Sequence, residues 1–187
     1  ELDVEAFIGR LWMSDLHPML NNTLSVGLRR NRVEHFSLKG VIREKPYALT
    51  ATRNPAKASP AGLDVRLTGE EGGRTLQALG LYDNMRRGIL TFEGFIPDDK
   101  SPITGVLKVR ETFKIKNAPL LASILSVASF TGPLDLLTGE GVRFNHLSAR
   151  LSYHGNVLRV EDGIMRGLAM GLQMEGQYNT ETNMVAL

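Results

Sequence analysis

The four histidines are the first candidates for chemistry, because an imidazole can act as a general base or bind a metal ion near neutral pH. They are His17, His35, His146 and His154. His146 and His154 are separated by one predicted strand and its turn, and no carboxylate stands beside them at metal-ligand spacing. We therefore expect histidines on a solvated strand face and no metal site.

Two pairs of adjacent carboxylates could supply a general acid and a general base. They are Asp98-Asp99 and Glu161-Asp162. Both pairs lie where the sequence predicts a turn, and acidic residues are common in turns for backbone reasons. Neither pair therefore indicates catalysis.

The glycine-rich segments do not form a nucleotide-binding motif. Residues 68–73 lack the lysine of a phosphate-binding loop, and Gly139 and Gly141 do not complete a dinucleotide fingerprint. The chain has no Gly-x-Ser-x-Gly elbow and no cysteine, so thiolate catalysis and disulfides are excluded as well. The sequence predicts a protein that is not an enzyme and that uses no cofactor.

The densest charge feature is a basic cluster between residues 29 and 45. It admits two interpretations: a solvated outer face that also protects strand edges, or a surface that contacts anionic headgroups. No aromatic residues are interleaved to stack bases, so nucleic acid is not an expected partner. The cluster consists of Arg29, Arg30, Arg32, His35, Lys39, Arg43 and Lys45.

The composition is that of one ordinary folded domain. The 187 residues are 42% hydrophobic and 22% charged, with a net charge of +2 and a pI near 9.0. The chain starts at Glu1 without a signal peptide, and it reaches Leu187 inside a predicted strand. We expect residues 1–187 to be a single piece of a longer protein.

Alternation of apolar and polar residues predicts strands over most of the chain. The clearest examples are residues 23–29, 63–67, 107–115, 147–153 and 172–178. Short helices are expected at 3–12, where Val4, Phe7, Ile8 and Leu11 share one helical face, and at 74–79. The predicted fold is mainly β (α+β), an antiparallel sheet of roughly eight strands with one apolar face.

The uncharged stretch from Asn117 to Leu134 predicts a helix rich in leucine and serine near residues 117–137. Asn117 is a suitable N-cap, and Pro119 stands just inside the start. Gly132-Pro133 breaks the helix and restarts it. The two prolines and the repeated serines argue against a membrane span, which needs about 20 predominantly apolar residues.

Three segments resemble the AsmA-like C-terminal region of very large envelope proteins of Gram-negative bacteria (the AsmA/YhdP/TamB-type superfamily). They are residues 79–88 (Leu-Gly-Leu-Tyr-Asp-Asn-Met-Arg-Arg-Gly), Asn117-Ala118-Pro119 with the helix that follows, and residues 131–144. The resemblance covers residues 61–187, whereas residues 1–60 match in pattern only.

The resemblance implies a long, curved β-sheet that forms a hydrophobic groove in the periplasm, within a protein whose inner-membrane anchor lies outside this chain. It further implies non-enzymatic transport of phospholipid between the inner and outer membranes, and so a role in outer-membrane integrity. The expected partners are phospholipid acyl chains and, through the full-length protein, both membranes. The residues expected to line the groove are Leu107, Val109, Leu147, Leu151, Leu158, Val160, Leu172 and Met174.

The alternative is a structural or assembly module of the cell envelope. Its apolar face would be covered by its own helices, and it would bind protein partners through sheet edges. A hydrolase acting on envelope polymers is a third, weaker alternative. In either leading interpretation the strand near residues 173–178 offers an edge for self-association.

Overall fold

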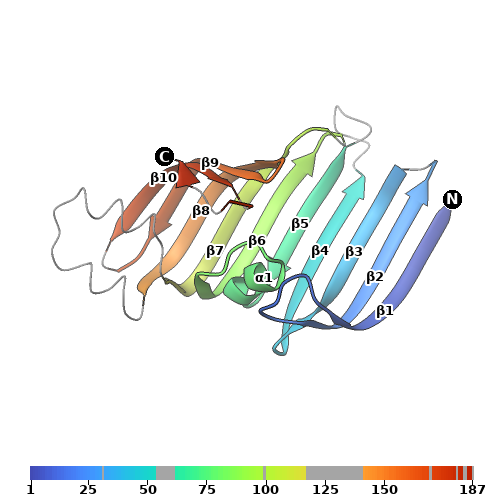
Figure 1. The fold of residues 1–187 in the computed structure, drawn as a ribbon, viewed down its shortest axis with the longest axis horizontal. Coiled ribbons are helices and arrows are strands. Elements are labelled where there is room, and N and C mark those ends of the chain that lie inside the picture. The colour runs from blue at the N-terminus through green and yellow to red at the C-terminus, as the bar shows by residue number, and fades with distance from the viewer. Residues whose placement is uncertain are drawn as a thin grey trace.

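The computed structural model describes residues 1–30, 32–53, 62–98, 100–116, 141–168, 170–179, 181–182 and 185–186. These residues form one curved, unclosed antiparallel sheet in which the strands follow one another in chain order, as Figure 1 shows. The predicted mainly β fold is confirmed, with more strands than alternation indicated. The strands are β1 (Leu2–Leu11), β2 (Met19–Arg29), β3 (Arg32–Ile42), β4 (Lys45–Arg53), β5 (Leu63–Gly69), β6 (Met85–Ile96), β7 (Ile103–Ile115), β8 (Val142–His154), β9 (Val157–Arg166), β10 (Gly171–Asn179) and β11 (Val185–Ala186).

The prediction of a helix at residues 3–12 is wrong, because these residues form β1. This strand pairs with β2 from Leu2 opposite Leu28 to Leu11 opposite Met19. An isolated ten-residue helix is marginal in water. Val4 and Ile8 are four positions apart, a spacing that fits a strand face as well as a helical one. Pairing with β2 therefore decides the conformation.

The one helix among the described residues is α1 (Gly72–Ala78), close to the predicted residues 74–79. Figure 1 shows it lying over β5 and β6 near one end of the strands. Its backbone comes very close to the sheet, since a Cβ on Gly73 would lie 2.5 Å from the Met85 carbonyl oxygen. The buried Gln77 side chain donates hydrogen bonds to the carbonyls of Asp83 (2.7 Å) and Met85 (3.0 Å), which fixes the turn between α1 and β6.

The hydrophobic core lies between α1 and the strands beneath it. Leu76 of the helix packs in one cluster with Leu90, Val109 and other buried residues of β5 to β9. Beyond Val109, toward the same end of β7 and β8 as α1, the rings of Phe113 and Phe144 stack with centroids 5.8 Å apart. The core is therefore confined to the helix side of one face.

One predicted feature, the helix near residues 117–137, lies outside the described residues. The turn predicted after the strand at residues 147–153 connects β8 to β9.

Candidate functional site

One face of the sheet is apolar across ten consecutive strands. The strand register places side chains in rows that run perpendicular to the strands, each row taking one residue from each strand. We number four of these rows from the α1 end. Row 2 consists of Ala6, Leu24, Leu38, Leu49, Leu67, Phe92, Leu107, Ala149, Gly163 and Met174.

Row 3 repeats this pattern two residues away along each strand, except in β9, where a bulge makes the step three residues. It contains only apolar residues and glycine, so a second apolar row crosses the same ten strands. Row 3 consists of Val4, Val26, Phe36, Ala51, Val65, Gly94, Gly105, Leu151, Val160 and Gly176.

Rows 1 and 4 border these two central rows. Row 1 lies on the α1 side and contains Tyr47, Gly69, Leu90, Val109, Leu147, Met165 and Leu172. Row 4 lies at the opposite ends of the strands and contains Leu2, Leu28, Val33, Arg53, Leu63, Ile96, Ile103, Tyr153, Leu158 and Tyr178. The register of β3 with β4 places Glu34 opposite Arg53 at the row 4 position, and these two are the only charged residues in the four rows.

The opposite face of the sheet is polar. Side chains alternate between faces along a strand, so the residues between rows 2 and 3 project from this other face. On it, Arg66 of β5 and Glu93 of β6 form an ion pair at 3.3 Å. The sheet is thus amphipathic as a whole. The polar row consists of Glu5, Ser25, Ser37, Thr50, Arg66, Glu93, Val106, Arg150 and Asp162.

The four apolar rows differ in how well they are covered. In row 1, Leu90 and Val109 are fully buried in the cluster that includes the α1 residue Leu76. The residues of rows 3 and 4, Phe36 excepted, belong to neither core cluster. Most of them are half-buried, and Val4 is 42% exposed. An apolar surface is therefore left partly uncovered along the side away from the helix.

All eight residues predicted to line a groove lie on this apolar face. Leu107 and Met174 are in row 2, Leu151 and Val160 in row 3, and Leu158 in row 4. The remaining three are in row 1, where Val109 and Leu147 are core residues. These two side chains are buried, so they offer a ligand little surface, and the lining role of the other six stays a prediction.

The basic cluster of the sequence does not form one surface. Arg29, Arg30 and Arg32 lie at the β2–β3 turn, whereas Arg43 and Lys45 lie at the β3–β4 turn. Successive turns of an antiparallel sheet are at opposite ends of the strands. His35 and Lys39 project from the polar face between them, where His35 Nε2 is 3.2 Å from Ser25 Oγ.

Arg53 is the functional candidate that the sequence analysis missed. It ends β4 and joins the three arginines of the β2–β3 turn around a cavity of about 500 Å³ that is also lined by Glu34. The signal that could have found Arg53 is that Leu49, Ala51 and Arg53 alternate with Thr50 and Thr52 and so belong to one strand face.

The candidate catalytic residues are dispersed. Among the described parts of the chain, no three His, Asp or Glu side chains form a group that could hold a metal ion. Where β8 pairs with β9, His146 lies across from Arg166 at one end of the pairing. His154 lies across from Val157 at the other end. These histidines therefore do not act as one site.

The two acidic pairs have different structural roles. Asp98 accepts hydrogen bonds from the backbone N–H groups of Lys100 and Ser101, and these bonds hold the pKa of the exposed carboxyl below its usual value. Glu161-Asp162 was expected at a turn and instead lies inside β9. The register with β8 shifts between Arg150 and Leu151, which leaves Glu161 as the extra residue of a β-bulge.

No helix within the described ranges is long and apolar enough to cross a membrane. Comparison with known proteins gave no match to a protein-family model, to a curated protein or to a solved structure. The apolar face is therefore the feature on which a functional interpretation rests.

Proposed function

We propose that this chain is a non-enzymatic phospholipid-transport module that holds lipid acyl chains on rows 2 to 4 of its apolar face. The observation that carries the proposal is the continuity of these rows, which cross ten strands with one pair of charged residues, Glu34 and Arg53, in the outer row. Strands lie about 4.8 Å apart, so rows of this kind extend over about 43 Å from β1 to β10. Extended apolar surfaces of this kind on soluble proteins mark sites for lipid or protein partners.

An apolar face needs no polar contact to hold an acyl chain. Burying one methylene group contributes about 0.8 kcal/mol, so eight methylenes contribute about 6 kcal/mol. Because the rows contain few polar groups, the chain could slide along them without breaking directional bonds. This property suits a transport surface better than a single tight binding pocket.

The cellular setting follows from the resemblance described above. We propose that the chain is a periplasmic region of an inner-membrane-anchored protein and contributes to a bridge that carries phospholipid between the inner and outer membranes. The polar face, with its Arg66–Glu93 ion pair, then faces water, while the apolar face shields the lipid.

Photocrosslinking tests whether lipid occupies the apolar face. A benzophenone amino acid replaces Leu151 or Leu158 in the purified chain, and matched controls replace Arg150 or Arg159, the neighbours that project from the polar face. The chain is incubated with phosphatidylglycerol vesicles, irradiated and examined by mass spectrometry. We expect lipid adducts at Leu151 and Leu158 only. Equal capture at Arg150 and Arg159 would contradict the proposal.

A second candidate function is that of an assembly module that binds proteins through sheet edges. It is favoured by the outer edge of β10, where β11 pairs only with Gln177 and Tyr178. In the described part of the chain, the outer edge of β10 between Gly171 and Gly176 has no strand beside it. Absence of lipid adducts at all four crosslinker positions, together with edge-dependent capture of another chain, would favour this function.

A further inference from the structure

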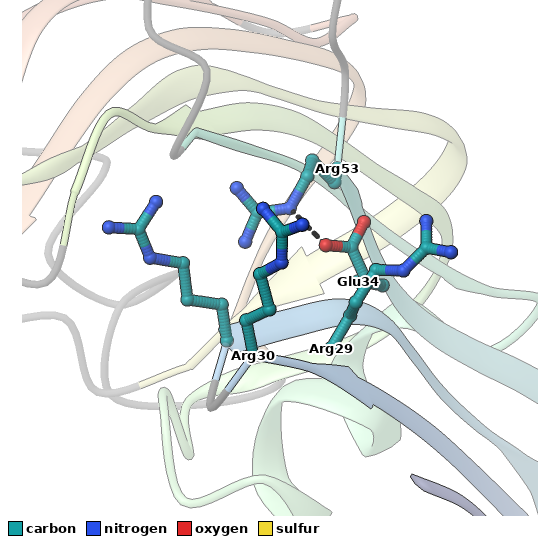
Figure 2. Close-up of a pocket in the computed structure, with 5 residues that line it drawn as sticks. Arg29, Arg30, Glu34 and Arg53 are labelled. Atoms are coloured by element: carbon teal, nitrogen blue, oxygen red, sulfur yellow. Dashed lines mark ion pairs between the residues drawn. The ribbon is translucent and has the colours of Figure 1, made fainter. Parts of the chain in front are cut away.

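A cluster of arginines lies where the apolar face ends. Arg29 ends β2, Arg30 is in the following turn, Arg32 begins β3 and Arg53 ends β4, so all four lie at the same end of the sheet. With Glu34 they line a cavity of about 500 Å³. Figure 2 shows the Arg53 side chain beside the Glu34 carboxylate and the Arg30 side chain reaching toward them, while the Arg29 guanidinium points away on the other side of Glu34.

Arg53 is held in a fixed orientation within this cluster. Its Nε lies 3.0 Å from Glu34 Oε1, and its Nη2 donates a 2.9 Å hydrogen bond to the Val33 carbonyl. The Arg53 side chain is only 14% exposed. The register of β3 and β4 explains the pair: His35 lies opposite Thr52, which places Glu34 beside Arg53 on the apolar side. The pair thus forms one wall of the cavity.

The remaining arginines leave the cavity with excess positive charge. Arg29 is 3.7 Å from Glu1, but both side chains are more than 60% exposed, so this ion pair is weak. Arg30 and Arg32 have no carboxylate within ion-pair distance among the residues that the structure describes. Four guanidinium groups therefore face two carboxylates, and two of the guanidinium groups are available to a ligand.

The position of the cavity relative to the apolar rows defines the kind of ligand. Arg53 belongs to row 4 and lies between Glu34 and Leu63, and the apolar pair of Leu28 and Val33 follows beyond Glu34. A molecule bound at the cavity thus has cations at one end and the half-buried apolar side chains of rows 3 and 4 at the other. This arrangement fits an anionic amphiphile.

We propose that Arg29, Arg30, Arg32 and Arg53 form a phosphate-binding site that takes the headgroup phosphate of a phospholipid at the border of the apolar face. The identity of the phosphate as a lipid headgroup rests on the function proposed above, whereas the phosphate chemistry rests on the arginines. A guanidinium group presents N–H donors in a planar fork that matches two phosphate oxygens at once. Several such forks around one cavity recognise a phosphate group and hold the lipid at one place on an otherwise featureless surface.

Three probes separate the contributions of headgroup and acyl chains. They are dioctanoyl phosphatidylglycerol, glycerol phosphate and dioctanoylglycerol, each titrated into the chain by calorimetry below its critical micelle concentration. The test variant is Arg30→Gln/Arg32→Gln. The matched control is Arg43→Gln/Lys45→Gln, which removes the same charge from the exposed turn at the opposite end of the sheet.

We expect Arg30→Gln/Arg32→Gln to lower the affinity for dioctanoyl phosphatidylglycerol about tenfold or more, because charge-assisted hydrogen bonds to the phosphate are lost. The control variant should bind phosphatidylglycerol as the unaltered chain does, and dioctanoylglycerol should bind all three proteins equally. If both double variants lowered the affinity for phosphatidylglycerol equally, the loss would come from net charge alone, and the phosphate site would be overturned.

The probes also distinguish failure of the site from failure of the proposed function. If dioctanoylglycerol binds and the arginine variant keeps full affinity for phosphatidylglycerol, the phosphate site is overturned and the lipid-binding face stands. If glycerol phosphate binds as tightly as phosphatidylglycerol and with the same arginine dependence, the phosphate site stands for a soluble ligand and the lipid-binding face is overturned. Absence of binding by every probe overturns both.

Discussion

The Tyr47 hydroxyl donates a 2.5 Å hydrogen bond to Oδ1 of Asn22, and both side chains are buried on the apolar face beside α1. The amide nitrogen of Asn22 in turn donates to the carbonyls of Ile8 and Met19, each at 2.9 Å. Through these bonds one polar pair fixes the hairpin of β1 and β2 against β4. Burial raises the pKa of Tyr47 to about 12, because the phenolate would be poorly solvated.

We predict that Tyr47→Phe lowers the free energy of unfolding by about 1–3 kcal/mol, since the buried Asn22 oxygen loses its donor. The raised pKa also makes stability depend on pH. Between pH 10 and 12 the unfolded phenol ionises and the folded one does not, so stability is full below pH 10 and falls toward pH 12. Urea unfolding at pH 8 and pH 11 measures both effects.

The change of the free energy of unfolding with pH provides the control for this prediction. The pKa of Tyr82 is likewise raised to about 12 by burial, so Tyr47→Phe should reduce the loss of stability between pH 10 and 12 without abolishing it. If the free energy of unfolding of Tyr47→Phe fell between pH 10 and 12 as steeply as that of the unaltered chain, Tyr47 would not titrate as a buried group.

Asp substitutions on two rows should separate core residues from surface available to lipid. Val109→Asp places a charge at a fully buried position, and we expect it to cost about 3–5 kcal/mol or to prevent folding. Leu151→Asp is at a half-buried row 3 position, so the fold should be retained while capture of lipid by a crosslinker at Leu158 is lost. Thermal unfolding followed by circular dichroism, with crosslinking of the folded variant, tests both. Retention of lipid capture in Leu151→Asp would contradict the row 3 assignment.

The close approach of α1 to β6 should make Gly73 intolerant of a side chain. The Cβ of Gly73→Ala would lie 2.5 Å from the Met85 carbonyl oxygen, so the helix must move away from the sheet. We expect a net destabilisation of about 1–3 kcal/mol by urea unfolding, even though alanine favours helix. Gly9→Ala is the control, because its Cβ would meet nothing within 4 Å. Equal stability of Gly73→Ala and the unaltered chain would contradict the packing described for α1.

The exposed edge of β10 should promote association between copies of the chain at high concentration. Gln173→Lys adds a charge at this edge and is expected to reduce association in sedimentation velocity experiments, because edge lysines oppose strand pairing. Ser148→Lys places the same charge on the interior strand β8 and should leave association unchanged. Equal effects of the two variants would point to net charge instead of the edge.

The strand segments named from the sequence were predictable because apolar residues recur at alternate positions over a sufficient length. In β8, Leu147, Ala149 and Leu151 alternate with Ser148, Arg150 and Ser152, so the face of each residue followed directly from the sequence. In β1 the apolar residues fit two periodicities, and only pairing with β2 decides between them. Local pattern is insufficient wherever a tertiary partner decides the conformation.

The placement of charged and polar side chains was less predictable. Asn22 is fully buried because Tyr47 and two carbonyls satisfy its amide, and these partners are distant in sequence. Arg53 joins Arg29 and Arg32 because β4 ends next to the β2–β3 turn. Alternation assigns such residues to a face, but the register that brings them together depends on the whole sheet.

The order of the strands has a consequence for how the protein unfolds and varies. Every strand pairs only with its neighbours in sequence, so the sheet resembles a linear array of hairpins in which stability is a sum of nearest-neighbour terms. Unfolding should begin by fraying of the terminal hairpins, while the strands under α1 open last. Addition or loss of one hairpin would lengthen or shorten the apolar rows by about 10 Å without altering their cross-section. The span of such a surface can therefore change by duplication of a two-strand unit.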